Sequence, residues 1–218
     1  MLVTRAGINS FIVTLGMASV YSGLVFILTK AEAYRKLPRP FVKFGKARWV
    51  EIDWLALSPM IFIAVAVTAL VYLLYHQTAF GRRMLATGAN ERAARLSGVP
   101  VDRVVQATHA LSGGLAGLAG IMLVSRLGSA LPSVGQDWLL PSFAAPIVGG
   151  TLLSGGAVSV GGALLGALLI ESVSVGLTLL NVPSFWIQLF VGLVLLLAVL
   201  LDRVRSVTAS RARLGAAR

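Results

Sequence analysis

The sequence predicts an all-α integral membrane protein, a polytopic bundle of about six transmembrane helices with one short cytoplasmic helix. Hydrophobic residues make up 57% of the 218 residues and charged residues only 12%, whereas about 25% of a typical soluble domain is charged. The apolar residues form continuous runs instead of alternating, which favours membrane helices over barrel strands. We therefore expect one transmembrane domain over residues 1–218.

The apolar runs give the expected spans. A helix needs about 20 apolar residues to cross a hydrocarbon core about 30 Å thick. The runs that meet or approach this length are residues 8–29, 54–75, 104–125, 138–154, 160–180 and 184–201. The first run is longer than the apolar part of a secretory signal, about 7 to 15 residues, and is interpreted as a helix.

Lysine and arginine indicate the orientation. If the polar segment 76–103 is cytoplasmic, six spans place both termini there, together with the arginine-rich tail 202–218. The basic residues on that side narrowly outnumber those in the opposite loops, as the positive-inside rule requires. Despite the net charge of +11, nucleic-acid binding is not expected, because the basic residues are dispersed between helices. The bilayer is the partner that this charge fits.

Motifs for enzymatic chemistry are not found in the sequence. There are no cysteines and only two histidines, His76 and His109, which lack the spacing of a metal site. We interpret both as interfacial or interhelical side chains. Neither a GxSxG elbow nor a GxxxxGK[ST] phosphate loop occurs. We therefore expect no catalytic residue, metal or cofactor, and no ATP hydrolysis by this chain itself.

Two spans carry glycines at helical spacing. Gly113, Gly117 and Gly120 fall on one face of the third span, and Gly162 and Gly166 are four residues apart in the fifth. Small residues at such spacing allow another membrane helix to approach closely. Both sets are predicted to pack against neighbouring helices.

Glu171 lies near the middle of the fifth span. A carboxylate at bilayer depth is costly unless it is paired, hydrated or protonated. Two interpretations stay open: Glu171 lines a water-filled pathway, or it ties two helices together by a hydrogen bond. Ser174 and Thr178 are candidates for the same roles.

The polar segment "GANERAARLSGVPVDR", Gly88 to Arg103, is predicted to contain a short closed helix. Asn90 is a good N-cap, and Glu91 complements the positive end of the helix dipole. Gly98 suits the C′ position, where φ is positive, and Pro100 prevents continuation. The residues alone leave three possibilities open: docking into a soluble partner, lying on the membrane surface, or a plain hydrophilic turn.

Within this segment, "GANERAARLSGV" resembles the cytoplasmic coupling segment of permease subunits of ribose-type ABC sugar importers. That pattern is roughly GxNxxAAxxxG followed by Ile or Val, and the matching residues are Gly88, Asn90, Ala93, Ala94, Gly98 and Val99. Further stretches match in the same order along the chain. They are "FIVTLGMAS" (11–19), "VGGTLLSGG" (148–156) and "GLVLLLAVLLD" (192–202).

The resemblance implies a non-enzymatic permease subunit in the bacterial inner membrane, forming a pathway for a sugar or similar small polar solute. It implies three partners: a cytoplasmic ABC ATPase, a second permease subunit in a homodimer or heterodimer, and an extracytoplasmic solute-binding protein. It also implies which residues contact the ATPase. They are Gly88, Asn90, Glu91, Arg92, Ala93, Ala94, Arg95 and Gly98.

The chain departs from the family pattern in several places. These permeases have about ten spans, and this chain starts where the later part of the pattern starts, so we expect four N-terminal helices to be absent. Glu171 stands where the family commonly has glycine, and Ser174 and Val175 replace paired asparagines. One alternative is a truncated scaffold that assembles without transporting. The other is a branched-chain amino acid permease, whose coupling segment lacks the GxNxxAA pattern.

Overall fold

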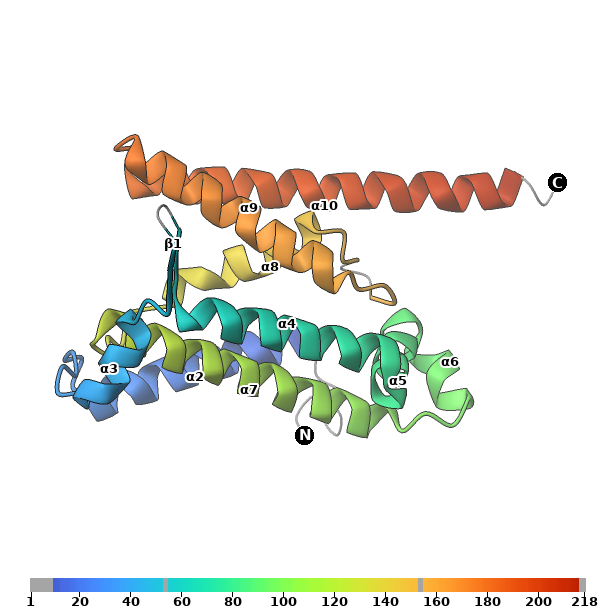
Figure 1. Ribbon diagram of the computed structural model, residues 1–218. Helices are drawn as coiled ribbons and strands as arrows, with labels where there is room; N and C mark the ends of the chain where they lie inside the picture. The colour runs from blue at the N-terminus through green and yellow to red at the C-terminus, as the bar shows by residue number, and fades with distance from the viewer. Residues whose placement is uncertain (1–9, 53–54, 153–154, 216–218) are drawn as a thin grey trace. The chain divides into compact units, whose positions relative to one another are not determined.

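The computed structural model describes residues 10–52, 55–152 and 155–215, which are almost entirely helical (Figure 1). They form two compact units, Met1–Leu70 with Arg92–Val134, and Val71–Glu91 with Gly135–Arg218. The three boundaries fall within one apolar helix after Leu70, after Glu91 at the first residue of the short polar helix, and in the loop after Val134. The predicted fold class is confirmed. The predicted single domain over residues 1–218 stays a prediction.

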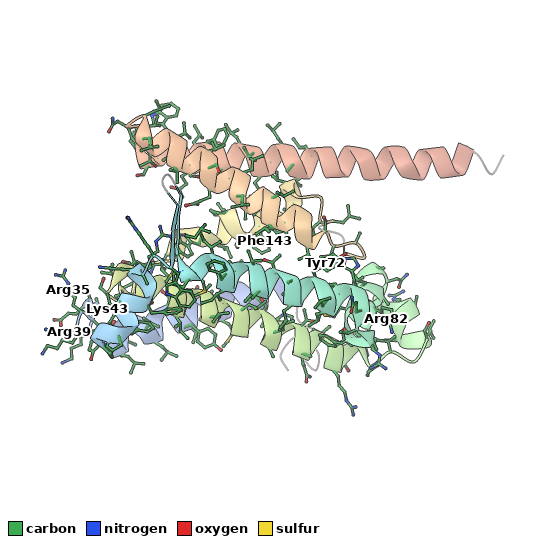
Figure 2. The ribbon with its side chains drawn as sticks, in the orientation of Figure 1. Arg35, Arg39, Lys43, Tyr72, Arg82 and Phe143 are labelled. Carbon is green, nitrogen blue, oxygen red and sulfur yellow. The ribbon has the colours of Figure 1, made fainter. Side chains whose placement is uncertain are left out.

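The first unit combines long apolar helices with a short amphipathic helix and a hairpin. Its elements are α2 (Ser10–Thr29), α3 (Arg39–Lys46), β1 (Val50–Ile52), β2 (Leu55–Leu57), the start of α4 (Pro59–Gln77), nearly all of α6 (Glu91–Leu96), and α7 (Val101–Leu127). Strands β1 and β2 pair antiparallel, with Val50 opposite Leu57. The side chains of Arg35, Arg39 and Lys43 gather around α3 and point away from the ribbon (Figure 2).

The loop between α2 and α4 is fastened to the end of α7. Gly45 of α3 is buried directly against the backbone of Ser125, and the Ser125 hydroxyl donates to the Phe41 carbonyl oxygen at 2.6 Å. Tyr34 and Ala130 exchange backbone hydrogen bonds at 2.9 Å. The segment between α2 and α4 is therefore packed against the end of α7.

The second span begins later than predicted. Residue 54, its predicted start, lies outside the described residues, and residues 55–57 belong to β2. Helix α4 starts at Pro59, a residue favoured in the first helical turn because its missing N–H has no intrahelical acceptor there. Hydropathy could not distinguish an apolar strand from the first turn of an apolar helix.

The second unit is built around a short helix. Besides the end of α4 it contains α5 (Ala79–Ala89), η1 (Gln136–Trp138), α8 (Leu139–Val148), α9 (Val160–Leu179) and α10 (Ser184–Gly215). Helix α8 packs on both α9 and α10, and its Ala144 is fully buried with Ile170 and Val191 in the core. The Thr78 and Ser159 hydroxyls cap α5 and α9 by accepting from the N–H groups of Gly81 and Gly162.

Four described helices are long and apolar enough to cross a membrane, over residues 12–29, 59–77, 101–127 and 160–179. Helix α8 has 10 residues, or about 15 Å at 1.5 Å per residue, half of a hydrocarbon core. It ends at Gly149, before Gly150 with φ of +87°. The predicted fourth span, 138–154, is thus helical over only part of its length, and α10 continues into the predicted tail as far as Gly215. The count of six spans stays a prediction.

Replacing Gly162 by alanine is expected to weaken the contact between α8 and α9. A Cβ there would overlap the Gly149 carbonyl oxygen and lie 2.6 Å from the Ser159 hydroxyl, so the helices must separate, at a cost of about 1–3 kcal/mol. Gly161 is a matched control, because a Cβ at this neighbouring position meets nothing within 4 Å. Thermal unfolding in detergent should show a lower midpoint for G162A than for G161A. Equal midpoints would contradict the packing described here.

Candidate functional site

The predicted polar helix is present as α6, Glu91–Leu96, and glycine closes it. Gly98 has φ of +79°. The N–H of Val99 donates to the Ala94 carbonyl oxygen and that of Gly98 to the Arg95 carbonyl oxygen, both at 3.0 Å. This pair of bonds is a Schellman motif, which needs a left-handed residue at C′. The prediction that Gly98 ends the helix is confirmed, and Asn90 immediately precedes its first residue.

A salt bridge joins α6 to α7. The Arg95 guanidinium lies 2.6 Å from the Asp102 carboxylate, and α7 begins at Val101, directly after Pro100. Ala94 of α6 and Val101 at the start of α7 are both buried, at 4% and 2% exposure. The family resemblance implied that Arg95 contacts the ATPase; in the structure it is paired with its own chain, and its contact with the ATPase stays a prediction.

Only one of the two adjacent alanines of α6 is exposed. Ala94 is 4% exposed, so its methyl group is not available to another protein, whereas Leu96 is 91% exposed. Arg92 and Ala93 are also exposed, and they precede Leu96 by four and three residues, which places them beside it on the helix. We call Arg92, Ala93 and Leu96 the α6 face. Leu96 was not among the residues that the resemblance implied for this contact, because the burial of Ala94 cannot be recognised from the local sequence.

In the second unit, the end of α5 contacts the loop before α9. A Cβ on Gly155 would overlap the Gly88 carbonyl oxygen, and a Cβ on Gly156 would lie 2.9 Å from the Cβ of Ala89. Gly155 and Gly156 have φ of +85° and +86°, a conformation that glycine adopts without steric cost. Two stretches recognised separately in the sequence, at Gly88 and at 148–156, are therefore packed together.

A cavity of about 650 Å³ opens between α8, α9 and α10. We call it the Glu171 pocket. Its lining residues are Trp138, Leu140, Pro141, Ser142, Ala145, Ala167, Ile170, Glu171, Ser174, Ser184, Ile187, Gln188 and Val191. Of the three candidate pathway residues, the structure brings Glu171 and Ser174 together here. Thr178 is exposed, donates to the Ser174 carbonyl oxygen at 2.8 Å, and does not line the cavity.

The two glycine sets have different surroundings. Gly162 and Gly166 lie against the backbone of α8, where a Cβ would overlap carbonyl oxygens. A Cβ at Gly113, Gly117 or Gly120 meets no described atom within 4 Å. Packing of the α7 set against another helix therefore stays a prediction.

The histidines lie outside any described metal-binding group. His109 ties α7 to α2, with Nδ1 2.8 Å from the Val105 carbonyl oxygen and Nε2 3.3 Å from the Ser10 hydroxyl. A carbonyl oxygen only accepts hydrogen bonds, so Nδ1 donates to Val105. The His76 ring lies 4.3 Å from that of Tyr72. Among the described residues, no group of three or more possible ligands is placed to hold a metal ion.

Comparison with known proteins gives matches along nearly the whole chain. The ribose import permease protein of Bacillus subtilis is 38% identical over 208 residues, covering 94% of this chain and 63% of the relative. The L-arabinose ABC transporter permease protein of Azospirillum brasilense is 37% identical over 204 residues, covering 94% of this chain and 59% of the relative. The xylose transport system permease protein of Escherichia coli is 46% identical over 126 residues, covering 58% and 32%. No solved structure matches.

The chain thus spans about three fifths of the length of the first two relatives. A family model described as the permease component of the branched-chain amino acid transport system matches residues 1–199. This match covers the first unit, most of the second, and the polar segment between α5 and α7. The chain therefore belongs to this family of membrane transport permeases.

Proposed function

We propose that this chain is the membrane permease subunit of an ABC importer that carries a monosaccharide or a similarly small polar solute. The observation that carries the proposal is the similarity, over 94% of the chain, to permeases named for ribose and L-arabinose import. The more local match to a xylose permease agrees with it. These names favour a sugar over a branched-chain amino acid, although the family description mentions the latter.

The α6 face is the surface that we assign to the cytoplasmic ATPase. Isolated helices shorter than about 12 residues are marginal in water, but α6 is held by its Schellman motif and by the Arg95–Asp102 salt bridge. It therefore offers a preformed surface. Leu96, at 91% exposure, gains free energy when a partner's groove removes it from water, and Arg92 supplies a positive charge beside it.

The contact between α5 and the loop before α9 supports a mechanical route by which movement of α6 displaces α9. Glu91, the first residue of α6, follows Gly88 by three residues, and Gly88 lies against Gly155. Because backbone touches backbone, displacement of the end of α5 also displaces the start of α9. ATP binding and hydrolysis shift the permease only if the ATPase contacts its two conformations with unequal free energy.

The complete assembly in this proposal contains a second permease subunit and an extracytoplasmic solute-binding protein. Its permeases lie in the bacterial inner membrane with both termini of this chain in the cytoplasm. The basic residues of the α6 segment then face anionic cytoplasmic lipid and the ATPase. The rival function is a scaffold that assembles with the same partners without carrying solute.

Uptake measurements separate these two functions. Proteoliposomes containing the chain, its ATPase and its solute-binding protein should accumulate radiolabelled D-ribose, L-arabinose or D-xylose when ATP is enclosed. A partner ATPase lacking its phosphate-loop lysine is the control, because that lysine holds the nucleotide phosphates. An assembled complex that takes up none of these sugars, while hydrolysing ATP, would favour the scaffold.

Replacing Leu96 by aspartate is expected to weaken association with the ATPase. The change removes an exposed apolar anchor and puts a charge in its place, costing about 2 kcal/mol, or roughly thirtyfold in Kd. Leu131, 41% exposed after the end of α7, provides the matched control L131D. Titration of detergent-solubilised variants with labelled ATPase measures both. If L96D binds as tightly as L131D and the unchanged chain, the α6 face is not the docking surface.

Replacing Gly155 by alanine should uncouple the ATPase from transport more than replacing Gly150 does. Both glycines have similar φ, +85° and +87°, so each substitution carries the same backbone cost of about 1–2 kcal/mol. Only at Gly155 does a Cβ also overlap Gly88, because at Gly150 it meets nothing within 4 Å. The readout is the number of solute molecules imported per ATP hydrolysed. Equal ratios in G155A and G150A would refute the proposed route.

A further inference from the structure

The Glu171 pocket collects most of the polar side chains of three otherwise apolar helical segments, while Ser172 and Thr178 of α9 lie outside it. Ser142 is the only hydroxyl, amide or charged residue of α8, and Glu171 is the only charged residue of α9. Ser184 and Gln188 are the only hydroxyl or amide residues of α10 between 184 and 200. All of them line this one cavity. Polar side chains within a membrane cost free energy unless they are paired, hydrated or bound to a ligand. Their convergence on one cavity is therefore unexpected if they serve only as lipid-facing or packed residues.

Helical spacing explains how the groups meet. On α9, Ala167, Glu171 and Ser174 follow an i, i+4, i+7 pattern, and on α10 Ser184, Gln188 and Val191 do the same. Residues at this spacing share one face of a helix. Both faces contribute polar side chains to the cavity, one set from α9 and the other from α10. Ile170 and Val191, which belong to the apolar core with Ala144 of α8, also line it. Its volume of about 650 Å³ suits a small molecule.

The pocket offers hydrogen-bond acceptors in excess of donors. The Ser142 hydroxyl donates to the Leu139 carbonyl oxygen at 2.7 Å, and the Ser174 hydroxyl donates to that of Ile170 at 2.8 Å. Their protons are therefore engaged, and their oxygen lone pairs remain. An ionised carboxylate only accepts hydrogen bonds, and within the described part of the chain Glu171 has no hydrogen-bond or ion-pair partner. Gln188 supplies one amide donor group and one further acceptor, and Trp138 and Ser184 add one N–H donor and one hydroxyl.

We propose that the Glu171 pocket binds solutes rich in hydrogen-bond donors, either neutral polyhydroxy compounds or their cationic amino derivatives, and that Glu171 excludes anionic ones. The donors of such a solute satisfy the free acceptors of Glu171, Ser142 and Ser174. A phosphate or carboxylate would bring further acceptors and a negative charge that the Glu171 carboxylate repels. The proposal rests on the proposed function in that the transported solute is the ligand.

Cysteine accessibility tests the pocket without requiring transport. The chain has no cysteine, so a single S174C substitution in the full chain places one thiol in the pocket. S172C is the matched control, because Ser172 is on the same helix, is exposed, and does not line the cavity. The probes are a trimethylammonium-ethyl and a sulfonato-ethyl methanethiosulfonate, which are of similar size and opposite charge. If S174C fails to assemble in membranes, S142C tests the same pocket from α8.

We expect the cationic reagent to modify S174C about tenfold faster than the anionic one, relative to the same ratio at S172C. The E171Q substitution, added to each variant, should abolish most of this preference at S174C and leave S172C unchanged. D-ribose and D-glucosamine should slow modification of S174C, while D-ribose 5-phosphate at equal concentration should not. An unreactive thiol, equal rates for both reagents, or equal protection by the phosphate would overturn the proposal.

The labelling and uptake experiments fail independently. If the expected labelling pattern appears in a complex that imports no sugar, the pocket stands and the proposed function falls. If sugar uptake is intact while S174C shows neither charge preference nor protection, the function stands and the pocket is not on the solute's route.

Discussion

The hydrocarbon interior of a bilayer offers the peptide backbone no hydrogen-bond partner, and this constraint explains most of the structure. Long helices satisfy their own backbone groups, which accounts for α2, α4, α7 and α9. Where the chain leaves a helix, other groups must replace the missing bonds. After the short α8, the Thr151 N–H donates to the Pro146 carbonyl oxygen at 2.9 Å, and the Ser159 N–H donates to the Thr151 hydroxyl at 3.3 Å. The half-length helix is thus possible because its end is satisfied internally.

Glycine makes the second unit compact under the same constraint. Apolar side chains gain little by leaving lipid for each other, so membrane helices associate through close backbone packing. Gly149, Gly162 and Gly166 allow α8 and α9 to approach until backbone meets backbone. The contact of Gly88 with Gly155 extends this packing to the end of α5. The end of α5 is therefore in close backbone contact with the loop that leads into α9, the helix bearing Glu171.

Local patterns in the sequence were sufficient for three of the long apolar helices, the glycine C-cap of α6 and the family. Apolar runs mark α2, α7 and α9, and Gly98 with Pro100 marks the end of α6. What local patterns could not reveal depends on contacts between distant residues. The Ser125 hydroxyl finds the Phe41 carbonyl 84 positions away, and the Arg95–Asp102 salt bridge depends on the turn at Pro100. Hydropathy correctly indicated that α8 is apolar. It could not indicate where α8 ends, because Leu152 beyond the helix is as apolar as residues within it.

In the candidate site too, the sequence identified some residues and only the folded structure identified the others. The sequence singled out Glu171 by its charge in an apolar span, yet Ser142 and Gln188, its companions in the pocket, are unremarkable until α8 and α10 are folded against α9. Likewise Ala93 and Ala94 form an obvious pair in the sequence, but only burial shows that Ala94 faces inward and leaves Leu96 as the apolar group on the outside. Function in this account depends on which residues the packing exposes.

Site-directed crosslinking of α6 to the ATPase is the most direct measurement of the central claim, that the chain is a permease subunit driven through α6. The chain has no cysteine, so L96C and the control L131C each carry a single thiol. With cysteines introduced along the groove of the ATPase that faces the membrane, oxidation should crosslink L96C in high yield, with a yield that changes when ATP is bound. L131C should give none. A transporting complex in which L96C crosslinks no better than L131C would contradict the account.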